Sequence, residues 1–368
     1  MTNKKSVYMT AGILILLVVA LSWTAIVQFN GNAISEKGTY SVGAILPLSG
    51  PAASMGEDAK LGAELAVKEI NNAGGVDGMN LELIFQDGEA VPAKSLNSFN
   101  YLVEVKGVDK VLTFVSSVIL SIKPVSEQKE VILLGSASHP AVTQDSNYVV
   151  RYSQTAAQEG DLFVDYANKN GFNKIGIVYL NDDYSVAIKD YLKISLAGKQ
   201  VKSEAFAKSD VDLKTQVTKI NDFNPDVVVF IGYTPSVGEG VKNLRTLGYD
   251  GDILASWGFG SARISGPAED YAKGVFYTEF TDVSNPTVSK KIILDKLTKK
   301  TDHKVGMLAL VFYDYVYVLR DMIESADSLD NKEIMESFSK RSKINTPVSK
   351  LNKQGYDIYP GLELVEFD

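Results

Sequence analysis

The first stretch whose residue types could bind a ligand is "VGAILPLSGPAASMGEDAKLG" (42–62). A short apolar run gives way to small residues where a helix is expected to begin, which is where phosphate-binding loops occur. A P-loop requires Gly-x4-Gly-Lys-Ser/Thr, in which the lysine reaches the phosphates. Here Gly50 and Gly56 are spaced differently, no lysine follows, and Glu57 and Asp58 would repel a phosphate. The stretch therefore does not predict a phosphate site.

Few side chains of this sequence suit catalysis or metal binding. The absence of cysteine excludes thiol catalysis, disulfides and cysteine-ligated zinc. The two histidines, His139 and His303, are too few for a histidine-rich metal site and give a Ser-His-Asp triad little to work with. No G-x-G-x-x-G follows the first strand, which argues against a dehydrogenase. We therefore predict that the protein is not an enzyme and has no cofactor, metal or catalytic residue.

The charge of the chain excludes another class of partner. Its formal net charge is −8 over 368 residues, whereas duplex binding depends on lysine and arginine side chains that neutralise phosphates. The acidic residues are spread along the chain, as on an ordinary soluble surface. We expect no nucleic-acid partner.

The N-terminal segment (1–35) differs in kind from the rest. Two lysines precede the apolar run "AGILILLVVALSWTAIVQF" (11–29), which is long enough to span a bilayer as a helix. A cleaved signal peptide is the competing interpretation, because "GNA" (31–33) carries small residues where a signal peptidase would cut. The length of the run favours an uncleaved anchor. Both interpretations export everything after residue 35, so we expect an extracytoplasmic protein.

From residue 39 onward, short β-rich runs alternate with amphipathic helices, which indicates an α/β fold with mostly parallel sheets. Two similar α/β units follow one another. The expected strands are 40–46, 81–85, 110–115, 131–135, 174–180, 201–206, 226–232, 252–256 and 274–278. The expected helices are 54–72, 156–170, 211–222, 236–247, 286–300, 306–326 and 331–341, with two more that open at Pro92 and Tyr184.

The positions of the strands predict where a ligand should bind. In open parallel sheets, ligands bind beyond the carboxyl ends of the strands. The stretches just after the strands are rich in hydroxyl and small residues: "PLSGPAA", "QDGEA", "SSV", "SASHP", "NDDYS", "GYTPS" and "SWGFG". No acid–base constellation stands out among them, which favours binding over catalysis.

Several stretches, in order, resemble a known family. They are "GAILPLSGPAASMGEDAKLGAELAVKEINNAGGVDGMNLELIFQD" (43–87), "SSVILSIKPVSEQKEVILLGSASHP" (116–140), "YVVRYSQTAAQEG" (148–160), "KIGIVYLNDDYSVA" (174–187), "PDVVVFIGYTPSVGEGVKNLRTLGY" (225–249) and the tail "INTPVSKLNKQGYDIYPGLELVEF". Together they resemble the type I periplasmic solute-binding proteins of the branched-chain amino-acid (Leu/Ile/Val-binding) ABC-transporter class. The resemblance covers essentially everything after residue 38.

The resemblance implies two Rossmann-like lobes joined by a multi-strand hinge. It assigns 39–153 and 281–342 to lobe 1, and 154–280 and 343–368 to lobe 2. Such lobes close about the hinge over a ligand. The implied function is capture of a small organic ligand, an amino acid or a related carboxylate or amide, for an ABC permease in the membrane, by a monomeric protein. A ligand-sensing ectodomain that acts with a signalling partner is the alternative; the chain shows no second transmembrane or signalling segment before Asp368, which favours transport.

The family's motifs also imply the residues that contact ligand. On lobe 1, the resemblance makes the Ser117 and Ser138 hydroxyls donors to a ligand carboxylate, with main-chain contacts from Ser136 and Ala137; helix capping is the alternative role for the two donor serines. On lobe 2, it places Tyr184 and Tyr233 over the ligand. Asp182, Asp183 and Ser49 are weaker candidates, since acidic pairs in loops are usually solvated caps and Ser49 also suits a tight turn.

One departure from the family leaves the ligand open. Amino-acid-binding members place an acid after the strand near 252–256, where it pairs with the ligand's ammonium, but here Trp257 stands at that position. A buried ammonium needs a partner, and an indole offers only a cation–π face. Met55 stands where branched-chain binders carry an aromatic residue. The expected site therefore includes Trp257 in its wall, with an amino acid held differently, an aromatic acid, or another small carboxylate or amide as ligand.

Overall fold

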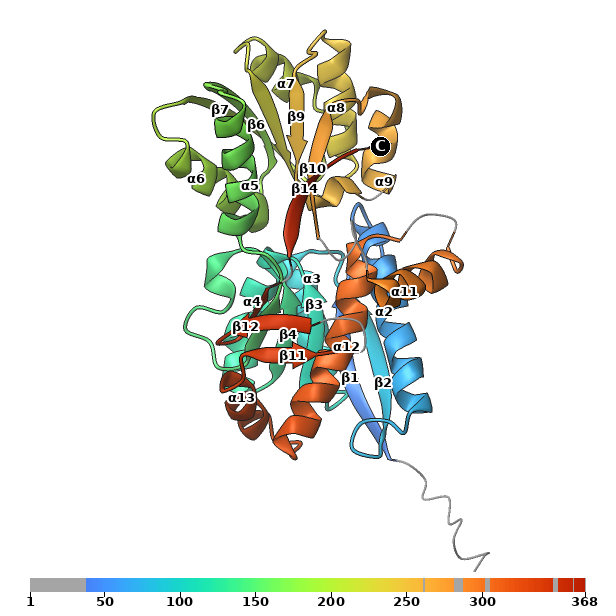
Figure 1. Cartoon of the computed structure of the whole chain (residues 1–368). Helices are drawn as coiled ribbons and strands as arrows, with labels where there is room; N and C mark the ends of the chain where they lie inside the picture. Colours follow the sequence, from blue (N-terminus) through green and yellow to red (C-terminus); the bar gives the residue numbers. More distant parts are fainter. Residues whose placement is uncertain are drawn as a thin grey trace, which may run out of the picture.

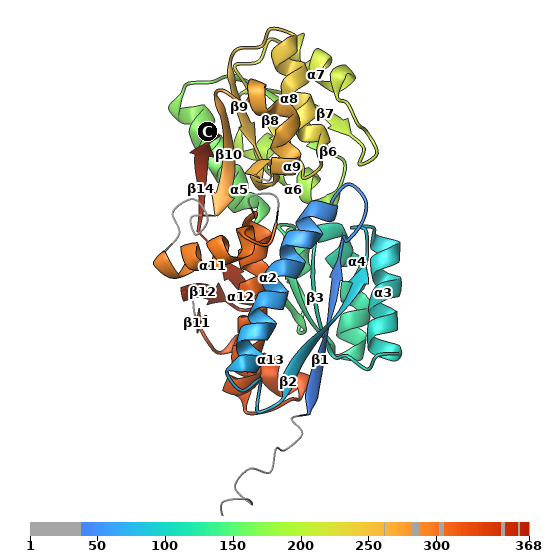
Figure 2. The ribbon, with the colours of Figure 1, turned by 90° about the vertical axis from the view of Figure 1, so that its right-hand side faces the viewer.

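The computed structural model describes residues 38–260, 262–280, 287–301, 305–346, 350–359 and 361–367. This part of the chain forms two α/β lobes stacked end to end (Figures 1 and 2). The predicted export segment (1–35) lies outside the described residues. Within them, no helix has the length and apolar character needed to cross a bilayer.

Lobe 1 is built on an eight-stranded sheet in the order β11-β12-β13-β5-β4-β3-β1-β2. Its strands are β1 (Thr39–Leu46), β2 (Asn80–Asp87), β3 (Lys110–Phe114), β4 (Ile132–Ser136), β5 (Val149–Tyr152), β11 (Lys343–Asn345), β12 (Lys350–Gln354) and β13 (Asp357–Tyr359). Its helices are α2 (Ala53–Asn72), α3 (Pro92–Glu104), α4 (Ser116–Lys129), α11 (Val288–Thr298), α12 (Met307–Ala326) and α13 (Asn331–Ser339). Both β3 and β4 are buried along their whole length, as expected for parallel strands covered on both faces.

Lobe 2 is built on a six-stranded sheet in the order β14-β10-β9-β8-β6-β7. Its strands are β6 (Lys174–Leu180), β7 (Gln200–Phe206), β8 (Val227–Ile231), β9 (Asp252–Ala255), β10 (Val275–Phe280) and β14 (Leu362–Glu366). Its helices are α5 (Ala156–Lys169), α6 (Asp183–Ser195), α7 (Lys214–Asn221), α8 (Ser236–Thr246) and the short α9 (Ala262–Ser265). Helix α5 begins with a capping box, in which Thr155 and Gln158 satisfy each other's backbone N–H groups.

The two lobes repeat one topology, as the sequence predicts. Lobe 1 contains the order β2-β1-β3-β4-β5, and lobe 2 contains β7-β6-β8-β9-β10. In lobe 1 the chain runs from β1 to β2 on one side and then crosses to β3 on the other side of β1. In lobe 2 it does the same from β6 to β7 and then to β8. The switch points are therefore between β1 and β3 and between β6 and β8. Ligands of doubly wound sheets bind at this switch point, beyond the carboxyl ends of the strands. A ligand is therefore expected at the switch point of each lobe.

Helix α12 returns from the C-terminal part of the chain to lie beside α2 in lobe 1 (Figure 1). The two helices touch at Gly62, where a Cβ atom would lie 1.8 Å from the carbonyl oxygen of Ala309. The N–H of Gly306 donates to the Asp58 carboxylate at 2.7 Å, which joins the start of α12 to the first turns of α2. This packing anchors the loop after β1 at the face that meets lobe 2.

The C-terminal tail divides between the lobes, which corrects the assignment of 343–368 to lobe 2. Strands β11, β12 and β13 extend the lobe 1 sheet, because β13 pairs in parallel with β5, and Arg151 meets Asp357 at 2.9 Å across that pairing. Only β14 joins lobe 2, antiparallel to β10. The chain thus passes between the lobes after β5, after β10 and after β13 (Figure 2).

Candidate functional site

A small cavity lies between the lobes at both switch points. On lobe 1 its walls come from the ends of β3 and β4, the starts of α2, α4 and α12, and the residue after β5; on lobe 2 they come from the start of α6 and the segments after β8 and β9. The lining residues are Met55, Phe114, Val115, Ser116, Ser136, Ala137, Ser138, Ser153, Tyr184, Tyr233, Trp257 and Leu308. The free volume is about 20 Å³, which is room for roughly one water molecule. The cavity as it stands is thus smaller than an amino acid.

The lobe 1 wall carries hydroxyl and main-chain groups. Ser136 ends β4, and Ala137 and Ser138 follow it into the cavity. Ser116 opens helix α4 and also lines the cavity. The residue before it, Val115, has φ +81°, a conformation that is costly for a β-branched side chain and that recurs at functional sites. The turn from β3 into α4 is thus held in a strained shape at the cavity wall.

Ser117 lies elsewhere, although the sequence gives it the same role as Ser138. It lines an outer cavity of about 390 Å³, together with Asp182, Asp183, Lys208 and Tyr233. Its neighbour Ser116 takes the inner position, because successive residues of a helix point about 100° apart. Ligand contact by Ser117 and by Ser138 stays a prediction.

The lobe 2 wall consists of three aromatic rings. Tyr184 comes from the start of α6, Tyr233 from the loop after β8, and Trp257 from the loop after β9. The Tyr184 ring lies 6.1 Å from the Tyr233 ring and 6.3 Å from the Trp257 ring, measured between centroids. These three residues and the Ser136–Ser138 turn, all named from the sequence, therefore surround one cavity. That they contact a ligand remains untested.

Sequence reasoning missed Glu159, which lies directly behind this wall. Its carboxylate is fully buried and accepts hydrogen bonds from the Tyr184 hydroxyl at 3.1 Å, the Thr278 hydroxyl at 2.6 Å and the Trp257 backbone N–H at 3.2 Å. Burial raises the pKa of Glu159, and these donors act against that rise. A signal was present: Glu159 shares the buried face of α5 with Ala156, Phe163 and Ala167.

Of the acidic pair after β6, Asp182 and Asp183, the first has a structural role. Asp182 caps α6 by accepting from the Ser185 N–H at 2.9 Å, and its charge acts on the Tyr233 hydroxyl, whose pKa is raised by burial and by Asp182. Burial raises the pKa of Asp182. The ammonium of Lys208 lies 5.9 Å from the Tyr233 ring and donates to the carbonyl of Ala90 at 2.9 Å, across the interlobe boundary.

Two further residues from the opening stretch are placed by the structure. Ser49 is exposed, and its hydroxyl donates to Asp87 at 2.6 Å, which supports the tight-turn role rather than the cavity wall. Met55 lines the cavity. It also borders a second small cavity, which Trp257, Asp58 and Glu279 line as well.

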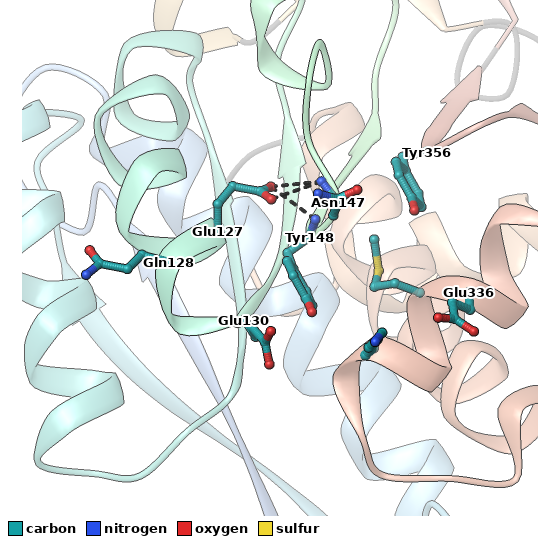
Figure 3. A pocket seen from close by; sticks show the side chains of 9 residues that line it. Glu127, Gln128, Glu130, Asn147, Tyr148, Glu336 and Tyr356 are labelled. Atoms are coloured by element: carbon teal, nitrogen blue, oxygen red, sulfur yellow. Dashed lines mark hydrogen bonds between the residues drawn. The ribbon is translucent and has the colours of Figure 1, made fainter.

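A larger cavity lies away from this site, in lobe 1 alone. It has about 580 Å³ and lies beside the C-terminal end of α4, the residues before β5, and α13. Figure 3 shows the Glu127 carboxylate directed at the backbone N–H groups of Asn147 and Tyr148. It accepts a hydrogen bond from each at 3.0 Å. Because Glu130 precedes β4 and Tyr148 precedes β5, this cavity is at the amino ends of the strands. The interlobe cavity, at the carboxyl ends, is the stronger candidate.

Comparison with known proteins decides the family. A model of the periplasmic binding protein family matches residues 39–357. The chain belongs to this family. The resemblance to Leu/Ile/Val-binding proteins is confirmed as well: the chain is 28% identical over 335 residues to a Leu/Ile/Val-binding protein of Rhizobium johnstonii, covering 87% of this chain and 90% of the relative.

Solved structures of periplasmic binding proteins share the two-lobe fold. A leucine-binding protein from Thermotoga maritima superposes with a TM-score of 0.82 at 25% identity, covering 89% of this chain and 95% of that chain. A solute-binding protein of an ABC transporter from Rhodopseudomonas palustris, in complex with 3,4-dihydroxybenzoic acid, superposes with a TM-score of 0.79 at 20% identity, covering 90% and 93%. The predicted fold class is confirmed.

Membership in the periplasmic binding protein family sets the broad role. The chain is a substrate-binding protein of the ABC-transporter type, and its relatives are solute-binding proteins rather than enzymes. The family implies an extracytoplasmic location. Among the described residues, no group of three or more His, Asp or Glu side chains is arranged to hold a metal ion.

Proposed function

We propose that this protein captures a small organic ligand, an amino acid or a related carboxylate or amide, in the interlobe cavity and delivers it to an ABC permease. It acts outside the cytoplasm as a monomer, and it has no catalytic activity. One observation carries the proposal: a single cavity joins the switch points of both lobes, with hydroxyl and main-chain groups on one wall and aromatic rings on the other.

The lobe 1 wall suits a carboxylate. Ser116 and Ser138 offer hydroxyl donors, and the turn from Ser136 to Ser138 offers backbone N–H groups. Hydrogen bonds from such donors to an ionised group are stronger than neutral ones. The lobe 2 rings then cover the rest of the ligand.

Capture requires hinge closure, because the walls leave space for only about one water molecule. The ligand binds between separated lobes, and its contacts with both walls favour the closed arrangement. A permease that recognises the closed arrangement then distinguishes the loaded protein from the empty one.

The emission of Trp257 tests this proposal. In full-length protein carrying Trp23→Phe, Trp257 is the sole tryptophan. Leucine, isoleucine, valine, trimethylglycine, and 3,4-dihydroxybenzoate are titrated in turn, and a ligand of the cavity should shift the emission saturably and raise the melting temperature. Two Ser→Ala variants locate the ligand. Ser138→Ala should weaken binding by about 1–3 kcal/mol, whereas Ser117→Ala should do so only if the ligand extends into the outer cavity. If bound ligand leaves Trp257 emission unmoved and Ser138→Ala and Tyr184→Ala bind it as the parent does, the site lies elsewhere.

A further inference from the structure

The lobe 2 wall offers a ligand aromatic faces but few hydrogen-bond acceptors. The Tyr184 hydroxyl donates to Glu159 at 3.1 Å and meets the Ser256 hydroxyl as well. The Tyr233 hydroxyl is within electrostatic reach of the Asp182 carboxylate, which with burial raises the pKa of Tyr233. The indole N–H of Trp257 can only donate. What these three residues present to the cavity is therefore mainly their ring surfaces.

The Glu159 carboxylate lies behind the rings, and the described groups that donate hydrogen bonds to it are all neutral. In addition to Tyr184, Thr278 and the Trp257 N–H, Glu159 accepts from the Gln154 side chain at 3.3 Å. These four described donors are uncharged, and the Glu159 side chain is fully buried. By contrast, Asp182, another carboxylate near the wall, is within electrostatic reach of the Lys208 ammonium. The wall as a whole thus has an excess of negative charge on the Glu159 side.

The donated Tyr184 hydroxyl adds to this field. A phenol that donates a hydrogen bond to a carboxylate carries more electron density on its ring, and the face of an aromatic ring already attracts cations. A cation that lies against Tyr184 and Trp257 is therefore favoured by the rings and by the buried charge behind them.

We propose that the cavity selects a ligand with a quaternary ammonium group, a donor-free cation held against Tyr184, Tyr233 and Trp257 with the Glu159 carboxylate behind them. This rests on the proposed function, in which the ligand's carboxylate lies on the lobe 1 serines. The substrate class is thus a small N-methylated zwitterion.

A primary ammonium fits this wall less well. Its three N–H groups need acceptors when water is removed, and the three wall residues offer only the two phenol oxygens, since the indole cannot accept. The Asp58 and Glu279 carboxylates line a neighbouring cavity and are not among the residues that line this one. A quaternary ammonium has no N–H group to satisfy, and its methyl groups pack on the rings.

The test compares two probes of the same shape. Trimethylglycine and tert-butylacetate have the same carboxylate and the same three methyl groups and differ only in a charged nitrogen against a neutral carbon. Dissociation constants are measured by calorimetry and by Trp257 emission in the full-length Trp23→Phe protein. We expect trimethylglycine to bind on the order of tenfold more tightly. Equal binding of the two probes, or tighter binding of the neutral one, would overturn the proposal.

Glu159→Gln tests the source of the selectivity. This variant keeps the side-chain shape and removes the charge, so the ratio of the two dissociation constants should fall towards one while tert-butylacetate binds as before. A merely structural role for Glu159 would weaken both probes equally, and that result counts against the proposal. Glu127→Gln is the matched control, because Glu127 accepts backbone hydrogen bonds in lobe 1 far from the cavity, and it should leave the ratio unchanged. If Glu159→Gln does not fold, the parent's ratio alone still decides whether the wall selects a cation.

The ligand panel separates failure of this inference from failure of the proposed function. Binding of leucine or 3,4-dihydroxybenzoate with a Trp257 shift, and none of trimethylglycine, would overturn the quaternary-ammonium class and leave the solute-binding role intact. A full panel with no Trp257 response would count against the interlobe site itself.

Discussion

The two walls of the interlobe cavity differ in what holds them. The lobe 1 wall is a set of small side chains on strand ends, in which Ser136 and Ser138 follow a buried strand directly. The lobe 2 wall is a set of large rings, two of which, Tyr184 and Trp257, are held from behind by hydrogen bonds to Glu159; Thr278 on β10 also donates to Glu159. Changes to lobe 1 should therefore affect ligand affinity alone, whereas changes to lobe 2 should also affect the stability of the lobe.

The largest expected effect is that of Tyr184→Ala. The variant removes a buried ring and leaves Glu159 without one of its donors, so we expect the free energy of unfolding to fall by about 3–5 kcal/mol. Ser138→Ala, on the opposite wall, should change it by about 1 kcal/mol or less. Urea denaturation followed by circular dichroism measures both. Tyr101→Ala, which truncates an exposed tyrosine, is the control for loss of a ring. Similar losses for Tyr184→Ala and Ser138→Ala would show that the two walls are held alike.

An intermediate effect is expected at Lys208, which links the two lobes outside the cavity walls. Its ammonium, on lobe 2, donates to the carbonyls of Glu89 and Ala90 on lobe 1 at 3.2 and 2.9 Å. Both acceptor residues have positive φ, +50° and +52°, so their backbone is held in a rarely populated region. Lys208→Met removes this cross-lobe contact and should favour separated lobes by about 1–3 kcal/mol.

Small-angle X-ray scattering measures this effect as a larger radius of gyration without ligand. Lys202→Met is the control, because Lys202 donates to the Lys219 carbonyl within lobe 2. If Lys208→Met scatters as the parent and the control do, Lys208 does not hold the lobes together.

The smallest expected effect is a pH dependence confined to the lobe 2 wall. Burial raises the pKa of Glu159 above its usual 4.5. A carboxyl whose pKa is raised in the folded state favours folding at pH values below its unfolded pKa, and this contribution is lost as the pH rises through the folded pKa. The stability of the parent relative to Glu159→Gln should therefore decrease as the pH rises from 4.5 through that higher value.

The same titration has a spectroscopic readout. The groups that face Glu159 are Gln154, Tyr184, Trp257 and Thr278. The Asp182 charge acts on Tyr184, whose pKa it helps to raise. Trp257 emission in the Trp23→Phe protein should titrate above pH 4.5 and should stop doing so in Glu159→Gln. An unchanged titration in that variant would assign it to another group, with Asp182 the next to test by Asp182→Asn.

Most of the fold could be predicted from the sequence. Buried parallel strands are unbroken apolar runs, so the predicted strand 226–232 corresponds to β8 (Val227–Ile231), and amphipathic helices are equally plain, so 54–72 corresponds to α2. The tail was harder. Strands β11 and β13 have three residues each, too few for an alternation of apolar and polar residues to be visible, and their sheet is decided by a pairing with β5 that is distant in sequence.

The candidate site was predictable in part. The stretches after the strands indicated where a ligand would bind, because the carboxyl ends of parallel strands meet at one edge of a sheet, and the family resemblance named Ser136–Ser138, Tyr184, Tyr233 and Trp257 within them. The choice between Ser116 and Ser117 was not predictable, since it depends on the exact turn at which α4 begins after Val115.

The sequence by itself determined the family, the two α/β lobes and the loops that face each other, because hydrophobic periodicity and local motifs are properties of contiguous residues. Only the tertiary structure decided what stands behind those loops. Glu159, Tyr184, Trp257 and Thr278 lie far apart in the chain, and their contact depends on how α5, α6, β9 and β10 pack. A buried carboxylate among neutral donors is a property of that packing. The charge of the lobe 2 wall, and with it the ligand that the wall favours, therefore follows from the fold rather than from any single motif.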